Sequence, residues 1–296
     1  MALTRRVFIK RAAAFIGGVT ALGSASESRQ DSRAGEVAKL KKAIVFSMIP
    51  DGLGLEERFA LARRAGFDGV EVGPVCDAQA VSAMRSAAEN AQVEIHSFIY
   101  GGWKAPLSSP DESVAEQGER EVAEALHCAK RLGADAVLLV PAVVNESTRY
   151  IEAYERSQKR LRRLIPEAEK NGVPILIENV WNNFLLSPIE FARYIDELDS
   201  PWVGAYFDVG NVVAFGWPED WIRTLGRRIR KVHLKDFRRG PRQWVNLREG
   251  DVNWPEVRRA LDEVGYSGYL TAELGGGDED YLRDAASRMD DIIAGK

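Results

Sequence analysis

Short apolar runs alternate with longer amphipathic stretches along most of the chain. Runs rich in Val, Ile and Leu cover residues 43–49, 67–72, 93–98, 136–141, 174–179, 203–208, 229–236 and 269–274. Runs of this length that lack strict alternation indicate strands buried on both faces of a parallel sheet. The stretches between them have helical spacing and predict helices over residues 56–65, 77–91, 113–132, 151–171, 187–197, 218–225 and 255–264.

The boundaries between these segments repeat one pattern. Residues 65–70, 132–137 and 264–269 each contain a Gly that ends a helix, and the next strand begins a few residues later. The eight alternations predict an α/β fold, a single (β/α)8 TIM barrel over residues 35–296. An open, doubly wound parallel sheet is the alternative that the pattern leaves open.

The first 34 residues differ in composition from the rest of the chain. Residues 4–10 read Thr-Arg-Arg-Val-Phe-Ile-Lys, an apolar stretch of small residues follows over 12–22, and a polar stretch covers 24–34. Positive charge before a short apolar segment is typical of an export signal, and the arginine pair resembles the twin-arginine type. We therefore expect residues 1–34 to be a twin-arginine signal peptide with a polar linker. The expected partner is the twin-arginine export machinery and the expected location is the periplasm; an amphipathic N-terminal anchor is the alternative.

Composition narrows the class of protein. The 296-residue chain is 45% hydrophobic and 28% charged, which is typical of a globular protein with a substantial core. Its formal net charge of -4 offers no basic surface, so we expect no nucleic-acid partner. Cys76 and Cys128 are far apart in the sequence, so we expect two small buried apolar residues and neither a disulfide framework nor a thiolate metal site. The oligomeric state stays open, with a homo-oligomer among the options.

Ligand-type side chains end the last four apolar runs: Glu178, Asp208, His233 and Glu273. The carboxyl ends of all strands in a closed α/β barrel meet at one mouth, so these side chains are expected to lie together. Three carboxylates and one imidazole form a site for one divalent metal ion. Mostly oxygen ligands favour Mn²⁺, with Mg²⁺, Co²⁺ and Zn²⁺ as alternatives. Taken singly, a strand-end carboxylate is also a helix cap or an ion-pair partner, and His233 can pair with Asp236.

The residues around these positions resemble the motifs of a known family. The chain carries Ile-Glu178-Asn, Phe-Asp208-Val-Gly-Asn211, Val-His233-Leu-Lys235-Asp236, Gly250-Asp-Val-Asn-Trp254 and Glu273-Leu. These segments are similar to those of the sugar phosphate isomerase/epimerase family, the xylose-isomerase-like barrels, over residues 43–290. Within the family they resemble ketose 3-epimerases and L-ribulose-5-phosphate 3-epimerase-like proteins. The resemblance implies that Glu178, Asp208, His233 and Glu273 bind the metal, and that Glu178 and Glu273 also exchange protons with the substrate.

A metal beside two glutamates suits proton transfer next to a carbonyl. A C–H bond beside a ketone ionises only if the charge on the developing enediolate oxygen is stabilised, and a coordinating cation does this. Two carboxylates on opposite sides then remove and return the proton, and acid–base catalysis of this kind is worth about 10²–10⁴-fold. Return to the opposite face gives epimerisation, whereas transfer between the two enediolate carbons gives aldose–ketose isomerisation. The sequence leaves both outcomes open.

Further residues are predicted to contact the substrate: Glu71, His96, Trp103, Asn211 and Lys235. Glu71 and His96 lie near the ends of the second and third strands, where they can hydrogen-bond sugar hydroxyls or the carbonyl, or be ordinary strand-end polar residues. Lys235 can hold a substrate oxygen or form an ion pair with Asp236. Asn211 departs from the His that ketose 3-epimerases carry at this position and matches the Asp-Val-Gly-Asn form of other members. The preferred sugar is therefore open.

The loops add aromatic and basic residues. Trp103 and Trp181 follow the third and fifth strands, where an indole can stack on a sugar or cover the barrel rim. Arg238, Arg239 and Arg242 follow the seventh strand. They form either a phosphate or carboxylate site or a solvated charge run, and we favour the second.

The leading hypothesis is a divalent-metal-dependent enzyme of the isomerase class that epimerises or isomerises a sugar or keto-sugar. Export favours a sugar without phosphate. The runner-up is a 3-keto-glycoside lyase, which uses the same proton abstraction but expels a leaving group. A DNA-repair endonuclease on this barrel needs many histidines for its multi-metal site, and the chain has three. A non-catalytic periplasmic sugar-binding protein does not need both Glu178 and Glu273.

Overall fold

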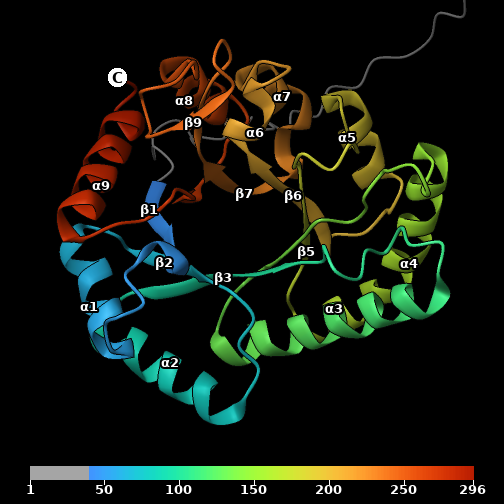
Figure 1. Cartoon of the computed structure of the whole chain (residues 1–296), viewed down its shortest axis with the longest axis horizontal. Helices are drawn as coiled ribbons and strands as arrows, with labels where there is room; N and C mark the ends of the chain where they lie inside the picture. The colour runs from blue at the N-terminus through green and yellow to red at the C-terminus, as the bar shows by residue number, and fades with distance from the viewer. Residues whose placement is uncertain (1–39) are drawn as a thin grey trace, which may run out of the picture. The chain divides into compact units, whose positions relative to one another are not determined.

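The strands of the described residues form one closed parallel barrel. The computed structural model describes residues 40–296, and Figure 1 shows the strands ringed by helices. The strand order around the barrel is β1-β10-β7-β6-β5-β4-β3-β2. The barrel strands are β1 (Leu40–Val45), β2 (Gly69–Val72), β3 (Glu94–Gly101), β4 (Val137–Leu139), β5 (Ile175–Glu178), β6 (Val203–Asp208), β7 (Ile229–Leu234) and β10 (Gly268–Ala272). Closure confirms the predicted (β/α)8 barrel over the open doubly wound sheet.

The helices follow the predicted ranges to within one residue at each end, and two were not predicted. They are α1 (Leu55–Ala65), α2 (Ala78–Ala91), α3 (Glu112–Leu132), α4 (Tyr150–Asn171), α5 (Pro188–Asp196), α7 (Pro218–Leu225) and α8 (Trp254–Glu263), with the unpredicted α6 (Val209–Val213) and α9 (Glu279–Ile293). Two glycines of the repeated pattern, Gly66 and Gly133, end α1 and α3 with φ of 103° and 86°. Only glycine adopts this left-handed conformation at no steric cost, which explains why the pattern predicted the helix ends so well.

The predicted signal peptide lies outside the described residues. None of the helices within residues 40–296 is long and apolar enough to cross a membrane.

A two-stranded hairpin follows β7 and was not predicted. It pairs β8 (Asp236–Arg238) with β9 (Gln243–Val245) in antiparallel register. The neighbouring arginines bind backbone carbonyls: Arg238 Nε donates to Glu249 O at 2.8 Å, and Arg239 donates to Val213 O and Gly216 O, both at 2.7 Å. Two of the three arginines therefore hold loops together, which differs from both the solvated charge run and the phosphate site expected from the sequence.

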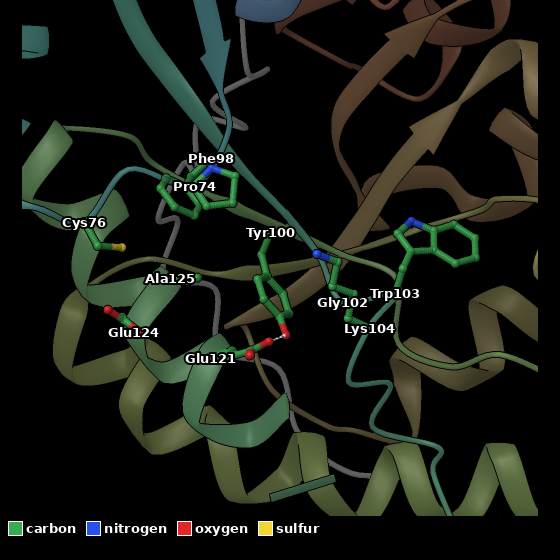
Figure 2. A pocket seen from close by; sticks show the side chains of 10 residues that line it. All are labelled: Pro74, Cys76, Phe98, Tyr100, Gly102, Trp103, Lys104, Glu121, Glu124 and Ala125. Atoms are coloured by element: carbon green, nitrogen blue, oxygen red, sulfur yellow. Dashed lines mark hydrogen bonds between the residues drawn. The ribbon is translucent and has the colours of Figure 1, made fainter. Parts of the chain in front are cut away.

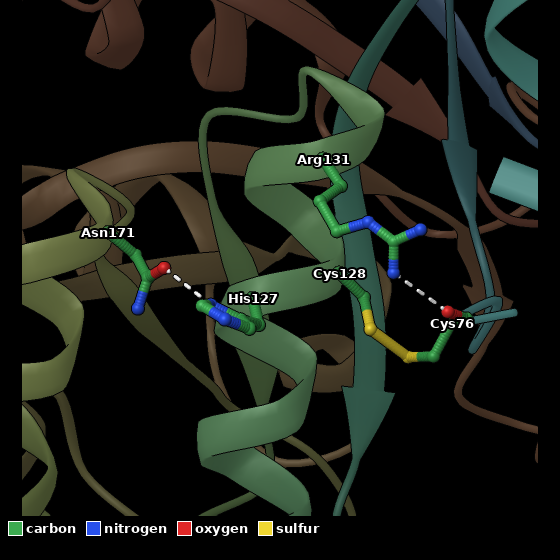
Figure 3. The surroundings of a disulfide bond; sticks show 5 residues. All are labelled: Cys76, His127, Cys128, Arg131 and Asn171. Atoms are coloured by element: carbon green, nitrogen blue, oxygen red, sulfur yellow. Dashed lines mark hydrogen bonds between the residues drawn. A yellow bond between two sulfur atoms is a disulfide. The ribbon is translucent and has the colours of Figure 1, made fainter. Parts of the chain in front are cut away.

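The cysteine prediction is wrong, because Cys76 and Cys128 form a disulfide (Figure 3). Cys76 lies in the loop after β2 and Cys128 lies on α3, with their Cα atoms 5.2 Å apart, inside the range that a disulfide requires. Arg131, one turn along α3, donates to Cys76 O at 3.0 Å and holds the same loop. The 52-residue separation carries no sign of this contact, because the barrel alone brings the loop beside the helix.

The barrel interior has an apolar half and a polar half. Ala136, Leu138, Leu176 and Tyr206 form a buried cluster separate from the larger core between barrel and helices. The other half contains buried polar side chains from β2, β3, β7 and β10: Glu71, His96, Ser97, Lys231, His233 and Thr271. Branched apolar residues usually fill the inside of such a barrel, so the polar half requires a separate explanation.

Candidate metal centre

The four predicted metal ligands converge at the carboxyl ends of their strands. Glu178 and Asp208 are the last residues of β5 and β6, His233 is the penultimate residue of β7, and Glu273 follows β10. One ligand atom from each lies within 4.8 Å of the others. The register that pairs Asp208 with His233 brings neighbouring strand ends level. The barrel therefore does what the sequence predicted of these residues: it gathers them at one point.

His233 Nδ1 faces all three carboxylates. It lies 3.0 Å from Glu178 Oε1, 2.8 Å from Glu273 Oε2 and 3.9 Å from Asp208 Oδ2. The Glu178, Asp208 and His233 side chains are buried, whereas the side chain of Glu273 is 33% exposed. Glu273 is thus the ligand through which the centre meets solvent.

Two buried oxygens of this cluster, Asp208 Oδ2 and Glu273 Oε2, make no hydrogen bond of good geometry and are approached only by charged groups. Buried carboxylate oxygens usually have partners, and these two face the same point as His233 Nδ1. Lys235 Nζ is near both, at 3.2 Å from Asp208 Oδ2 and 2.8 Å from Glu273 Oε2. Three carboxylates and one imidazole nitrogen with free acceptor atoms fit the donor set of a divalent cation. The residues present therefore fit the predicted metal.

Burial and mutual charge shift the protonation of the centre. Burial raises the pKa of Glu178 to about 7, against the opposing effect of His233. Burial also raises the pKa of Asp208. The opposite result holds for Glu273, where His233 and Lys235 overcome the effect of burial and lower the pKa. The negative charges of Glu71 and Glu273 overcome burial and raise the pKa of His233.

Glu71 lies behind His233 and not in the predicted position facing a substrate. It is fully buried, and its Oε2 is 2.5 Å from His233 Nε2. Ser97 Oγ donates to the other oxygen, Oε1, at 2.7 Å. A carboxylate on one ring nitrogen fixes the tautomer in which the other nitrogen is a free ligand. Glu71 therefore directs Nδ1 of His233 toward the metal centre.

His96 is also placed inside the barrel and apart from the metal centre. Its ring stacks on Tyr269 with centroids 4.2 Å apart, Nδ1 lies 3.2 Å from Lys231 Nζ, and Nε2 lies 3.1 Å from Thr271 Oγ1. Only 3% of the residue is exposed. These contacts use both ring nitrogens, so the structure gives His96 no free atom for the predicted substrate contact.

Asn179 and Asn211 hold the end of β6 in place. Asn179 bonds both backbone groups of Asp208, donating to its carbonyl and accepting from its N–H, each at 2.8 Å. Asn211 N donates to Asp208 Oδ1 at 2.6 Å, and Asn211 Nδ2 donates to Asn179 O at 3.0 Å. Asp208 thus uses one oxygen to cap α6 and leaves the other for the centre. The predicted substrate residue Asn211 is buried in this network, and Asn179 is a supporting residue that the sequence reasoning did not single out.

Lys235 faces the metal centre and does not pair with Asp236. Asp236 instead accepts from Phe237 N at 2.9 Å, Arg248 N at 2.8 Å and Trp254 Nε1 at 3.0 Å. These bonds also leave Asp236 away from His233, so neither predicted pairing of Asp236 forms. The ammonium of Lys235 is instead placed where a substrate oxygen near Glu273 can meet it.

A cleft of about 750 Å³ opens beside Glu273 and Lys235. Trp244 of β9 lines it, and this residue was missed because the short hairpin has no clear sequence signal. Trp181 stacks on Trp244 with ring centroids 5.0 Å apart. The other predicted aromatic, Trp103, lines a separate cleft of about 400 Å³ with Tyr100 and Glu121 (Figure 2). The structure therefore places Trp181 against Trp244, which lines the cleft beside the metal centre, and places Trp103 elsewhere.

A second group of ligand-type residues lies at the disulfide. Cys76, Glu124 and Cys128 have candidate ligand atoms within 4.8 Å of one another. Both sulfur atoms are used in the disulfide, so this group is not a thiolate metal site.

Comparisons with known proteins agree with the fold. The putative L-ribulose-5-phosphate 3-epimerase SgbU of Escherichia coli K12 is 27% identical over 240 residues, covering 75% of this chain and 84% of that protein. The L-ribulose-5-phosphate 3-epimerase UlaE of the same strain is 26% identical over 241 residues, covering 76% and 84%. Among solved structures, a D-tagatose 3-epimerase-like protein superposes with a TM-score of 0.75 at 19% identity, covering 86% of this chain and 98% of that one. The 3-keto-D-glucoside 4-epimerase YcjR of E. coli has a TM-score of 0.74 at 16% identity, covering 86% and 100%. The model of the xylose isomerase-like TIM barrel family matches residues 59–292, and the chain belongs to this family.

Proposed function

We propose that the protein is a divalent-metal-dependent sugar epimerase or isomerase that transfers a proton next to a carbonyl. The observation that carries the proposal is the convergence of His233 Nδ1 with three carboxylates at the carboxyl end of the barrel. Relatives named as L-ribulose-5-phosphate 3-epimerases support the reaction class. Mn²⁺ is the proposed ion, because the donor set is three carboxylates and one imidazole.

Glu178 and Glu273 are the proposed acid–base pair. They come from β5 and the end of β10, with β6 and β7 between them in the barrel, so they reach the centre from two sides. One carboxylate takes the proton from the carbon beside the carbonyl, and the C–H electron pair moves into the enediolate. The other carboxyl group returns a proton to the opposite face of that carbon, which inverts it. When bound, the metal stabilises the negative charge that develops on the substrate oxygens.

Lys235 and the buried supporting residues complete the proposed mechanism. The Lys235 ammonium, 2.8 Å from Glu273 Oε2, can donate to a substrate oxygen at the mouth of the cleft. Glu71 orients His233, and Asn179 and Asn211 orient Asp208. Because these residues are buried, the geometry of the ligands is set before a substrate arrives.

Deuterium exchange tests the proposal directly. The full chain, loaded with Mn²⁺, is incubated in D₂O with a panel of free ketoses and 3-keto-glycosides and followed by NMR. We expect deuterium beside the carbonyl, and we expect Glu178→Gln and Glu273→Gln to abolish its incorporation while remaining folded. Glu249→Gln is the matched control, because Glu249 lines the same cleft outside the ligand cluster. Full exchange by either glutamine variant of the pair would overturn the assignment, and binding of metal and sugar without exchange would favour the sugar-binding protein.

The same experiment separates the products. An inverted sugar identifies an epimerase, and an aldose–ketose pair identifies an isomerase. Release of an aglycone from a 3-keto-glycoside identifies the lyase, in which the proton leaves the same carbon but the electron pair expels the leaving group. The observation that favours this second candidate is Trp244, which lines the cleft and stacks on Trp181.

We also propose export to the periplasm by the twin-arginine route. The arginine pair at residues 5–6 and the apolar stretch that follows support it, and so does the disulfide, because disulfides persist in oxidising compartments. Replacing Arg5 and Arg6 together by Lys should retain the protein in the cytoplasmic fraction. Unchanged periplasmic recovery of that variant would contradict the route.

A further inference from the structure

The cleft beside the metal centre has an aromatic wall that the proton transfer does not use. Trp244 on the β8–β9 hairpin is 43% exposed, and Trp181, in the loop after β5, is 44% exposed. Their rings stack with an interplanar angle of 30°. Two exposed indoles side by side present an apolar surface on which a ligand ring can stack.

Buried neighbours hold both indoles in place. The buried Phe237 meets both indoles edge-on, with ring centroids 5.3 Å from Trp181 and 5.0 Å from Trp244. The indole nitrogen of Trp181 donates to Asn211 O at 2.9 Å, which ties the wall to the network around Asp208. An aromatic surface held in place in the free protein loses little conformational entropy when a ligand binds to it.

The wall is adjacent to the reacting position. Lys235, Trp244 and Glu273 line the same cleft. Lys235 Nζ lies 2.8 Å from Glu273 Oε2 and 5.7 Å from the ring centroid of Trp244. Glu273 Oε2 and the Trp244 ring centroid are therefore no farther apart than the sum of these two distances. This separation is about the span from one sugar ring to the next group attached to it. A substrate with its reacting carbon at Glu273 can therefore reach past Lys235 to Trp244.

The cleft is large for a single monosaccharide. Its volume of about 750 Å³ lies in the range of roughly 300–1,000 Å³ typical of pockets for drug-sized ligands. A free ketose held at the metal centre would leave the exposed part of Trp244 uncovered. A ligand with a second ring would cover that face, and indole faces stack well on the apolar side of a sugar or on an aromatic ring.

We propose that Trp244, supported by Trp181, binds a second ring of the substrate, so that the natural substrate is a glycoside and not a free monosaccharide. The reacting sugar lies at the metal centre, and its aglycone or neighbouring sugar stacks on Trp244. This inference rests on the proposed function for the reacting ring and names the substrate class.

A binding experiment with non-reacting ligands tests the inference separately from catalysis. Matched methyl and phenyl glycosides of glucose, galactose and mannose are titrated calorimetrically into the Mn²⁺-loaded full chain. These ligands lack a ketone, so no turnover interferes. We expect at least one phenyl glycoside to bind about 2- to 10-fold more tightly than its methyl partner, the range that one aromatic contact supplies.

The variants locate that preference. Trp244→Ala should remove the advantage of the phenyl glycoside and leave the methyl glycoside unchanged, and Trp244→Phe should keep part of it. Trp217→Ala is the matched control, because Trp217 is 61% exposed at the start of α7 and does not line the cleft. No phenyl advantage in the unaltered protein, or an undiminished advantage in Trp244→Ala, overturns the inference.

Exchange kinetics distinguish this inference from the proposed function. A Trp244-dependent phenyl preference without deuterium exchange on any sugar would leave the aromatic site standing and remove the proposed function. The opposite outcome is that free ketoses exchange deuterium with the same kcat/KM as keto-glycosides, both in the unaltered protein and in Trp244→Ala. That outcome would support the proposed function and refute the aromatic site.

Discussion

Replacing Glu71 by Gln tests how His233, the proposed metal ligand, is held. Glu71 is fully buried between His233 Nε2, 2.5 Å from Oε2, and Ser97 Oγ, 2.7 Å from Oε1. The amide has nearly the same shape, and the Ser97 hydroxyl can turn to accept a hydrogen bond where it now donates one. The substitution therefore removes one negative charge with little change in packing.

The lost charge should weaken metal binding and leave the fold intact. A carboxylate on the second ring nitrogen orients the imidazole and increases the basicity of the ligating nitrogen, and its removal typically costs 10–100-fold in metal affinity. This loss corresponds to about 1.4–2.7 kcal/mol of binding free energy. Both groups are buried at a short separation, where charge interactions are weakly screened, so we expect a value in the upper half of that range.

Calorimetric titration of Mn²⁺ into the dialysed protein measures the effect. At a saturating metal concentration, the stabilisation against unfolding should fall by the same free energy, because that stabilisation grows with the ratio of metal concentration to Kd. Ser97→Ala is the control that keeps the charge and loses only the hydroxyl, and it should change Kd less than Glu71→Gln. A folded Glu71→Gln protein with an unchanged Kd would refute the reasoning.

Three other predictions concern the centre and the frame around it. Metal affinity should rise with pH, because the pKa of Glu178 is raised to about 7 and that of His233 is also raised, so both groups give up protons to bind a cation. Calorimetry in buffers of different ionisation enthalpy should show proton release that declines as the pH rises through 7, and constant release would contradict this. Replacing both disulfide cysteines by serine should lower the free energy of unfolding by up to about 4 kcal/mol, the chain-entropy value for a link across 52 residues. A urea midpoint equal to that of the oxidised protein would argue against this stabilisation. Gly118→Ala should lower the free energy of unfolding by about 1–3 kcal/mol, since the added Cβ would overlap the Ala105 carbonyl oxygen. Gly73→Ala, with open space around it, should leave the unfolding midpoint unchanged, and equal midpoints for the two variants would refute the packing argument.

The convergence of the four candidate ligands was predictable because the barrel imposes a simple rule. Parallel strands end at one mouth, so a ligand-type residue at the end of each of four strands is placed by topology alone. Glu178, Asp208, His233 and Glu273 needed only the correct strand ends, and errors of a few residues elsewhere did not matter. The first strand illustrates this tolerance: it covers Leu40–Val45, earlier than the predicted 43–49, with no effect on the site.

Glu71 and His96 were misplaced because strand β3 is irregular. Val70 pairs with Ile95, but Glu71 pairs with Ser97, so the register skips His96. A residue added at such a bulge breaks the alternation of inward and outward side chains. Ser97 and His96 consequently both reach partners inside the barrel, which a period-of-two pattern does not predict.

The residues that the sequence reasoning missed depend on contacts between distant segments. Cys76 and Cys128 meet only because α3 packs beside the loop after β2. Trp244 belongs to a hairpin whose strands have three residues each, too short for a periodic signal. Its stacking with Trp181 joins loops 63 positions apart in the sequence, and no local pattern contains that information.

The polar half of the barrel interior follows from the position of the metal centre. Burying ionisable groups is unfavourable unless each has a partner, and an apolar packing of the same volume is often more stable. Here Glu71 pairs with His233, His96 contacts Lys231 and Thr271, and Lys231 Nζ lies 2.6 Å from Asp135 Oδ1. Thr271 and His233 are register partners on β10 and β7, the two strands that lead to the ligands His233 and Glu273. Tyr206 of the apolar cluster packs on the His233 ring, with centroids 4.4 Å apart, so the two halves meet at this histidine. The buried polar contacts around Glu71 and His233 are those expected if stability is given up for a fixed orientation of the imidazole.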